Sequence, residues 1–314
     1  MKEICKKKSD DFLVCLTHDV DWVRKKHQYL SRLFEINKEG VRKINLYHLK
    51  SLLSRKEPYW CFDKIIDIEN KFNVRSAFFF LSQIKSKFFE LPSGSSYRYS
   101  LNETKVREMV QYLDLNGWEI GLHGSYYSYN NFNQLNEEKL RLEKVLGKKV
   151  KSVRQHYLNI SIPETWEIQK SIGFDFDLTH GSNHSTGFQK NLLDKRNFWT
   201  VGDRTFDVHP QYFHIGNTDV FRPFNDDFFV IPLTIMDCSL FPKYKNLEKI
   251  LSKCIKTIKI AKSKNYILTI NWHQSSFNEK EYPNYSKLYS FIIECCMKAN
   301  AKFILPHEIP KFYE

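Results

Sequence analysis

The 314-residue sequence has no apolar run long enough to cross a bilayer, and its charged first eight residues lack the hydrophobic segment of a secretory signal. Its seven cysteines form no CxxC pair, and an odd count with adjacent Cys295 and Cys296 argues against a disulfide framework. It also lacks internal repeats and low-complexity tracts. These absences argue against a membrane-spanning or disulfide-stabilised protein, and we expect a reduced, cytoplasmic one.

The formal charge of +12 is the feature that suggests a nucleic-acid partner. The basic residues are, however, spread along the chain and mixed with acidic ones, as in residues 137–141, and no nucleic-acid-binding motif accompanies them. We therefore expect no nucleic-acid partner. We interpret the charge as a solvated basic surface, suited to peripheral association with anionic glycans or membrane surfaces.

Short apolar segments alternate with amphipathic ones along most of the chain. In one of the latter, Val106, Met109, Val110 and Leu113 recur at helical spacing, and Gly117 follows as a stop signal. Alternating strands and helices imply a largely parallel sheet. The predicted strands are 12–17, 75–82, 118–123, 150–154, 174–178, 228–234, 266–272 and 302–305, and the predicted helices are 22–36, 60–71, 104–115, 134–146, 162–171, 245–264 and 282–298.

About seven or eight such units in one run favour an α/β barrel over two separate domains. We therefore predict a single domain over residues 1–314. Two regions interrupt the alternation: residues 37–58 are polar and basic, and residues 181–226 are rich in aromatics, His, Asn and Asp. The length and aromatic content of the second region are typical of a functional rim or lid.

Two carboxylates, Asp19 and Asp21, follow the first apolar strand two positions apart. Side chains at this spacing on a strand point the same way, and the carboxyl ends of parallel strands are where α/β proteins collect ligands. Two crowded negative charges are unfavourable unless a cation or a shared proton offsets them. The pattern indicates a metal ligand beside a general base. The alternative is a loop in which Asp19 caps a helix that begins at Trp22.

Three further predicted strand ends carry His or Arg. His123 lies in a glycine-flanked turn, Arg154 and His156 end the next strand, and His273 ends the apolar run 266–272. Arg154 is suited to hold a carboxylate ionised, and a histidine is suited to general acid work. Each residue alone has a structural alternative, as a hydrogen-bonded turn histidine or a surface arginine. Four strand ends that each deliver Asp, His or Arg are hard to explain by packing.

In this order the segments resemble the motifs of the NodB-type polysaccharide deacetylases, carbohydrate esterase family four. Residues 17–21 resemble the first motif in its Asp-x-Asp variant, residues 120–123 the start of the second, and residues 272–273 the last. The resemblance extends from residue 13 to about residue 277. It implies a distorted parallel (β/α) barrel of about seven strands, related to the TIM barrel, and metal-dependent removal of acyl groups from N-acetylated sugars.

The resemblance also implies roles for individual residues. Asp19 matches the catalytic base, Arg154 the arginine that orients this base, and His273 the catalytic acid. We add Asp177, near another predicted strand end, as a candidate to hold His273 or sugar hydroxyls.

The metal site that the resemblance implies departs from the family pattern at one position. Asp21 and His123 match ligands of a divalent metal, with Zn²⁺ preferred. The family places a second histidine four residues after the first, and here that residue is Tyr127, a poor zinc ligand at neutral pH. We predict His156, at the next strand end, as the third ligand. The alternative is a reduced or absent metal site.

The predicted function is therefore hydrolysis of a non-peptide carbon–nitrogen bond, with an acetyl or other acyl group removed from an N-acylated amino sugar. Residues 154–158, 232–237 and 272–277 resemble bacterial deacetylase-like proteins of surface-polysaccharide gene sets, which implies that setting. Tyr127 motivates the alternative of a catalytically silent glycan-binding module on the same barrel. A third hypothesis is a deformylase or another amidohydrolase that acts on a lipid-linked or nucleotide-linked sugar. The sugar, the acyl group and the carrier stay open.

Overall fold

The computed structural model describes residues 3–25, 29, 34–36, 42–44, 46–53, 56–82, 98–182, 186–188, 219–224, 226–241 and 246–314. Its central element is strand β2 (Phe12–Val20), whose nine residues are all buried. Burial of both faces is typical of a parallel sheet that is covered on either side. β2 ends later than the sequence predicts, so that Asp19 lies within the strand.

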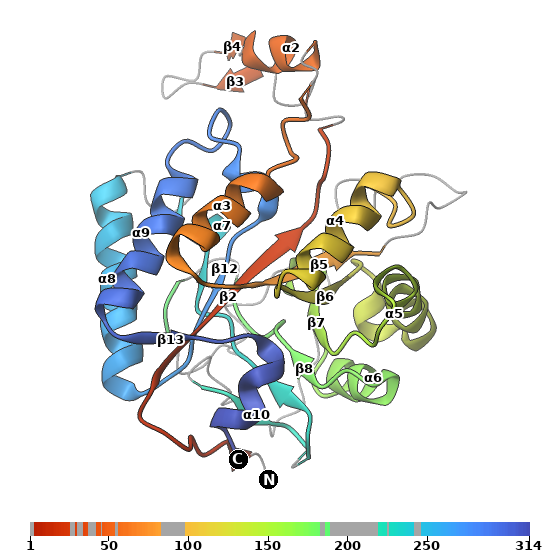
Figure 1. The fold of residues 1–314 in the computed structure, drawn as a ribbon, viewed down its shortest axis with the longest axis vertical. Coiled ribbons are helices and arrows are strands. Elements are labelled where there is room, and N and C mark those ends of the chain that lie inside the picture. The colour runs from red at the N-terminus through yellow and green to blue at the C-terminus, as the bar shows by residue number, and fades with distance from the viewer. Residues whose placement is uncertain are drawn as a thin grey trace.

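Seven strand positions form a curled, mostly parallel ring (Figure 1). One segment closes it, because β10 (Phe229–Val230) pairs with β8 while β11 (Ile235–Met236), further along the same segment, pairs with β12. This arrangement confirms the predicted distorted (β/α) barrel of about seven strands. From β8 to β12 the other strands of the ring are β8 (Phe176–Asp177), β7 (Ser152–Gln155), β6 (Glu119–Gly124), β5 (Ala77–Leu81), β2 and β12 (Leu268–Asn271).

The remaining described strands lie at the margins. β13 (Ala301–Phe303) pairs in parallel with the first residues of β2, and β1 (Glu3–Ile4) pairs antiparallel with β9 (Phe221–Arg222). β3 (Phe34–Ile36) and β4 (Arg42–Ile44) form a separate hairpin.

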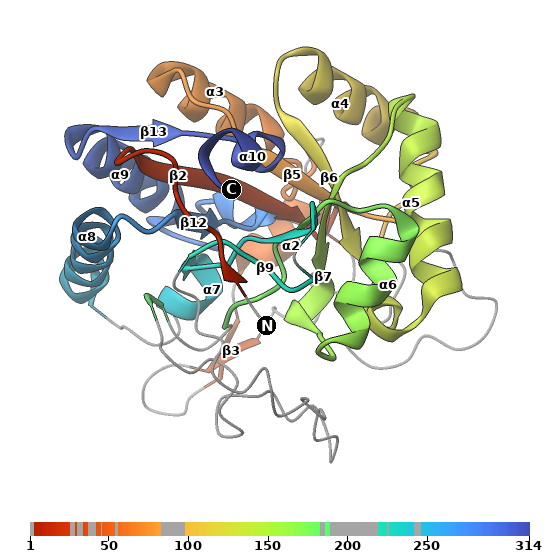
Figure 2. The ribbon, with the colours of Figure 1, turned by 90° about the horizontal axis from the view of Figure 1, so that it is seen from below.

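Helices are arranged around most of the strands (Figure 2). Each long helix buries an apolar face: in α4 the buried residues are Val106, Val110 and Leu113, which are among those that recur at helical spacing in the sequence. The described helices are α2 (Leu46–Leu52), α3 (Phe62–Phe72), α4 (Thr104–Leu115), α5 (Phe132–Leu146), α6 (Glu164–Ile172), α7 (Asp237–Leu240), α8 (Leu247–Lys264), α9 (Tyr285–Lys298) and α10 (Ile309–Phe312), with short 3-10 turns η1 (Ser128–Asn130), η2 (His156–Leu158), η4 (Gln274–Phe277) and η5 (Pro306–Glu308).

The predicted helix over 22–36 is wrong at both ends, because residues 22–25 are not helical and Phe34–Ile36 is a strand, whereas Tyr29, the described residue between them, is helical. The interruption predicted at 37–58 contains β4 and α2. Most of the interruption predicted at 181–226, including residues 189–218, lies outside the described residues. Within the part of the chain that is described, no helix combines the length and the apolar character needed to span a membrane.

Candidate active site

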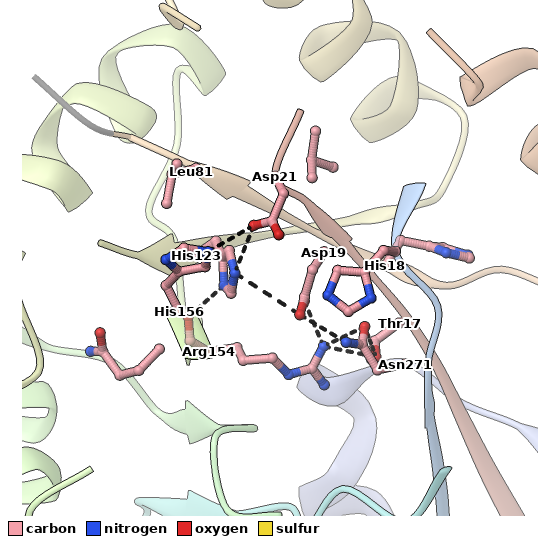
Figure 3. A network of polar contacts seen from close by, with 12 residues as sticks. Thr17, His18, Asp19, Asp21, Leu81, His123, Arg154, His156 and Asn271 are labelled. Carbon is pink, nitrogen blue, oxygen red and sulfur yellow. Dashed lines mark hydrogen bonds and ion pairs between the residues drawn. The ribbon is translucent and has the colours of Figure 1, made fainter. Parts of the chain in front are cut away.

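Asp19 projects from β2 into the ring, where Arg154 and Asn271 hold both of its oxygens (Figure 3). Arg154 Nη1 lies 2.8 Å from Asp19 Oδ1, and Asn271 Nδ2 donates to Oδ2 at 2.8 Å. Burial alone would raise the pKa of this carboxyl, but the Arg154 guanidinium, with help from nearby histidines, lowers the pKa to about 2. Asp19 is therefore a buried carboxylate that stays ionised.

Asp21 lies just beyond the end of β2 and faces two imidazoles. Its Oδ1 is 3.3 Å from Nε2 of His123 and 3.3 Å from Nε2 of His156. This oxygen is buried and accepts no hydrogen bond. Donors of a tetrahedral site with zinc distances of about 2.0–2.1 Å are about 3.3 Å apart. The three side chains form one of the two groups of His, Cys, Asp and Glu, among the described residues, whose atoms lie close enough to share a cation.

The neighbouring strands β6 and β7 position the imidazoles of His123 and His156. His123 on β6 stands opposite Arg154 on β7, and its Nδ1 donates to the Arg154 carbonyl oxygen at 2.9 Å. That bond leaves the Nε2 lone pair facing Asp21, as a metal ligand requires. Burial lowers the pKa of His156 to about 4, although Asp21 opposes this shift, so that the imidazole is neutral near pH 7. His156 is thus in the protonation state in which histidine binds metals, and the tautomer of His123 directs its Nε2 toward Asp21.

The loops after β6 and β7 place His156 in the donor group and leave Tyr127 outside it. Behind His156 the chain turns sharply, with left-handed backbone at Tyr157 and Leu158, an uncommon conformation for bulky residues. Tyr127, at the family's usual histidine position, is 42% exposed and packs against the ring of Tyr126. Tyr127 does not belong to the donor group.

His273 and Asp237 form a second cluster. His273 Nδ1 lies 2.7 Å from Asp237 Oδ1, and the backbone N–H of His273 donates to Oδ2 at 3.0 Å. Burial alone would lower the pKa of His273, but Asp237 overcomes it and raises the pKa to about 10. Cys238 completes a second group of possible metal donors with these two residues. Because both carboxylate oxygens of Asp237 are bonded to His273, we interpret the pair as a protonated histidine with its counterion.

Residues of both clusters line one cavity of about 320 Å³. Asp21 lines it from the first cluster, and His273 lines it from the second. Aromatic side chains, among them Trp22, Tyr59 and Tyr282, line the same cavity. A substrate group bound in this cavity can therefore contact both Asp21 and His273.

The structure adds one residue, Arg98, that the sequence does not predict at the site. Arg98 Nη1 lies 3.2 Å from Asp21 Oδ2, and its guanidinium stacks on the ring of Trp22 at 4.4 Å. Arg98 is buried, and although burial alone would raise the pKa of Asp21, Arg98 and the facing histidines hold this pKa well below its usual range. No motif marks this arginine in the sequence.

The role suggested for Asp177 is not supported by its position. Asp177 is fully buried and accepts hydrogen bonds from Trp166, Gln169 and Thr179. It does not contact His273, which is held by Asp237 instead. Asp177 is a structural carboxylate behind the ring.

His18, between Thr17 and Asp19, points to the opposite side of β2, as strand alternation requires. Its Nδ1 donates to the Trp272 carbonyl oxygen at 2.8 Å, and its Nε2 lies 2.9 Å from Glu69 Oε1. Glu69 is fully buried and also accepts from Trp118 and Tyr289. His18 therefore fixes β2 against the surrounding helices rather than entering the site.

Comparison with solved structures supports the fold. The PuuE allantoinase superposes with a TM-score of 0.57 and 12% identity over 97% of this chain and 91% of that one. A probable polysaccharide deacetylase from Pseudomonas aeruginosa PAO1 gives a TM-score of 0.54, with 12% identity over 96% and 91% of the two chains. One from Mycobacterium smegmatis, a putative polysaccharide deacetylase by description, gives 0.51, with 13% identity over 94% and 88%.

No protein-family model matches the sequence, and no curated protein matches it significantly. The structural similarities therefore establish the architecture, which is that of the NodB-type polysaccharide deacetylases expected from the sequence motifs.

Proposed function

We propose that the protein is a metal-dependent hydrolase that removes an acyl group, such as acetyl, from an N-acylated amino sugar. The proposal is carried by one observation: Asp21, the carboxylate of the donor group with His123 and His156, lines the same cavity as the His273–Asp237 pair. The fold supports it, since two of the similar structures are described as polysaccharide deacetylases.

The donor chemistry fits a divalent cation, with Zn²⁺ preferred. One carboxylate and two neutral imidazoles are a typical ligand set of catalytic zinc sites, which keep a position open. The buried Asp21 Oδ1 that lacks a hydrogen bond is the atom that such an ion would satisfy. When bound, the ion supplies Lewis acidity toward water and toward the acyl oxygen.

Asp19 is the proposed general base. Its Oδ2 lies 4.0 Å from His123 Nε2, so the carboxylate adjoins the donor group without belonging to it. Arg154 and Asn271 hold it in place and ionised. A pKa of about 2 also lowers its proton affinity, so it takes a proton efficiently only from a strongly acidified water. Asp19 is therefore expected to act as a base only when the cation is bound, whereas the cation is expected to bind without Asp19.

His273 is the proposed general acid. An amine departing from an amide needs a proton, and Asp237 keeps His273 protonated at neutral pH through a pKa of about 10. The side chain is partly exposed and lines the cavity, so the proton is accessible to a bound substrate. Aromatic rings in the same lining suit the apolar face of a sugar.

The test is a deacylation assay of the purified protein on N-acetylated amino sugars, with and without added Zn²⁺ or Co²⁺, together with metal analysis. We expect activity that requires metal and about one bound ion per chain. His156→Ala is expected to abolish both, whereas Tyr127→Phe, at the family's usual ligand position, is expected to preserve both. Sugar binding without metal or turnover would instead favour the silent glycan-binding module.

The setting of this activity is also a proposal. Residues 154–158, 232–237 and 272–277 resemble bacterial proteins of surface-polysaccharide gene sets. All seven cysteines are free thiols, in keeping with a reduced, cytoplasmic environment.

A further inference from the structure

Helix α2 exposes leucines and buries polar residues. Leu46, Leu49 and Leu52, spaced three apart, are 57%, 43% and 58% exposed, and Leu53 behind them is 87% exposed. On the other side of the helix, His48 and Ser51 are buried. A surface helix normally does the reverse, with its apolar stripe facing the protein. We call Ile44, Leu46, Leu49, Leu52 and Leu53 the α2 face.

Polar contacts hold the inner side of α2 and fix the outward direction of the leucines. His48 contacts Nζ of the buried Lys25, which also pairs with Glu281 Oε1 at 2.7 Å. Tyr47 shares hydrogen bonds with Asn278. Because these buried groups are paired through the polar side of the helix, turning the leucines inward would break a buried ion-pair network.

The α2 face lies close to the proposed active site. Glu281, which anchors α2 through Lys25, also accepts a hydrogen bond from Tyr59, and Tyr59 lines the cavity. Figure 1 shows α2, β3 and β4 projecting beyond the barrel, at the end toward which β2 points. That is the end from which Asp19 and Asp21 serve the site.

The charge around the α2 face indicates what kind of partner covers it. The sequence from residue 42 to residue 56 carries five basic residues and no acidic one. Of the described ones, Lys50 and Lys56 are exposed. Leucines flanked by lysine and arginine are typical of segments that lie in the interface of a bilayer with anionic lipids. A second copy of this chain would instead bring like charges together.

We propose that the α2 face docks on an anionic lipid bilayer. The leucines enter the boundary between headgroups and acyl chains, while Lys50 and Lys56 bind the lipid phosphates. The binding itself is independent of catalysis. Its consequence, which rests on the proposed function, is that the cavity opens beside the membrane and suits an N-acylated sugar on a lipid carrier rather than a free nucleotide sugar.

The experiment is co-sedimentation of the full chain with vesicles of phosphatidylcholine alone or mixed with phosphatidylglycerol, at low and high salt. We expect binding to the anionic vesicles that weakens with salt and is slight on phosphatidylcholine. The triple change Leu49→Ser, Leu52→Ser and Leu53→Ser is expected to weaken binding about tenfold or more.

A matched control separates the α2 face from general stickiness. Leu115, at the end of α4, is 83% exposed, nearly as much as Leu53. Leu115→Ser is expected to bind vesicles like the wild type, and Leu53→Ser to bind them more weakly. Circular dichroism checks that each variant is folded.

Three outcomes would overturn the proposal: no binding of the wild type to anionic vesicles, equal loss in the Leu53 and Leu115 variants, or dimerisation through the leucines without vesicle binding. None of them bears on deacylation, which is measured separately on a water-soluble N-acetylated sugar.

Discussion

Asp19 and Asp21 stand two residues apart on one strand end, and their surroundings differ in a way that separates their roles. Both oxygens of Asp19 are taken, one by Arg154 and the other by Asn271. Asp21 has one buried oxygen that accepts no hydrogen bond and lies between two imidazole nitrogens. A carboxylate whose hydrogen bonds are satisfied is fixed for proton transfer, whereas a carboxylate with an unsatisfied oxygen that faces two imidazole nitrogens is suited to bind a cation.

The comparison extends to the electrostatics. Arginine serves each carboxylate, but Arg154 bonds Asp19 directly at 2.8 Å, whereas Arg98 approaches Asp21 at 3.2 Å from the other oxygen. The guanidinium of Arg98 therefore leaves Oδ1 of Asp21 open. The different roles of Asp19 and Asp21 thus follow from the residues that contact them, since the two side chains are chemically identical.

The largest effect is expected from exchanging each carboxylate for its amide. Asp19→Asn and Asp21→Asn should each lower kcat/KM by about 10²- to 10⁴-fold, because one removes the base and the other a metal ligand. Only Asp21→Asn should weaken binding of Zn²⁺ or Co²⁺, as measured by metal titration. Asp175→Asn, at an exposed ion pair with Lys151, is the control and should change neither. Loss of metal in the Asp19 variant would contradict the division of roles.

A smaller effect is expected at the second cluster, where Asp237 sets the protonation of His273. With a pKa of about 10, the acid is available up to that pH, and Asp237→Asn should move the alkaline limb of the rate profile down toward or below neutral. Activity at pH 8 should fall by about 10- to 100-fold. His307→Gln, at a surface histidine that pairs with Glu119 at the same 2.7 Å, should leave the limb in place. An unmoved limb in Asp237→Asn would remove His273 from the role of acid.

The same pair has a stability signature of known sign. The pKa of His273 is higher in the folded state than its ordinary value of 6.5. Its contribution to stability is therefore complete below pH 6.5 and is lost as the pH rises through about 10. Asp237→Asn should flatten the alkaline decline of the melting temperature.

The smallest effect is expected at Asp177, which lies on a strand of the same ring but outside the site. Burial raises its pKa to about 6, although Thr179, Trp166 and Gln169 donate to it. Because the folded pKa lies above the usual 3.8, its stabilising contribution is complete below that pH and is lost as the pH rises through 6. Asp177→Asn should remove this dependence from thermal melts between pH 4 and 7. A large loss of activity in the folded variant would mean that Asp177 serves the site after all.

Much of the architecture could be predicted because local periodicity and burial agree. The predicted helix 104–115 has the same bounds as α4, since its apolar spacing and the following stop signal are local. The predicted helix 22–36 is wrong at its start because residues far along the chain bind the side chains there. Trp22 packs under Arg98, and Lys25 is drawn to Glu281. Such contacts override local helix propensity, and nothing in the segment itself announces them.

Site residues that end a strand could be predicted from the sequence. Contacts between site residues that depend on which strands are neighbours could not. Asp177 lies near the end of the predicted strand 174–178 and Asp237 follows the predicted strand 228–234, and we expected the wrong one of the two to hold His273. Asp237 follows β11, which pairs with the strand that ends before His273, whereas Asp177 lies on β8 across the ring. That order follows from the global winding of the chain, which no short segment encodes. Arg98 was missed for the same reason, because its partner lies far upstream.

Strand β2 pairs with β5, β12 and β13, and its alternate residues serve two unrelated purposes. A slip of one position would send Asp19 toward the buried Glu69 and present His18 to the ring. Two uncompensated carboxylates in the interior would make that misaligned product unstable. A register shift in β2 would therefore remove the catalytic residues from the site and also destabilise the fold. We accordingly expect no stable, inactive form of the protein with β2 misaligned.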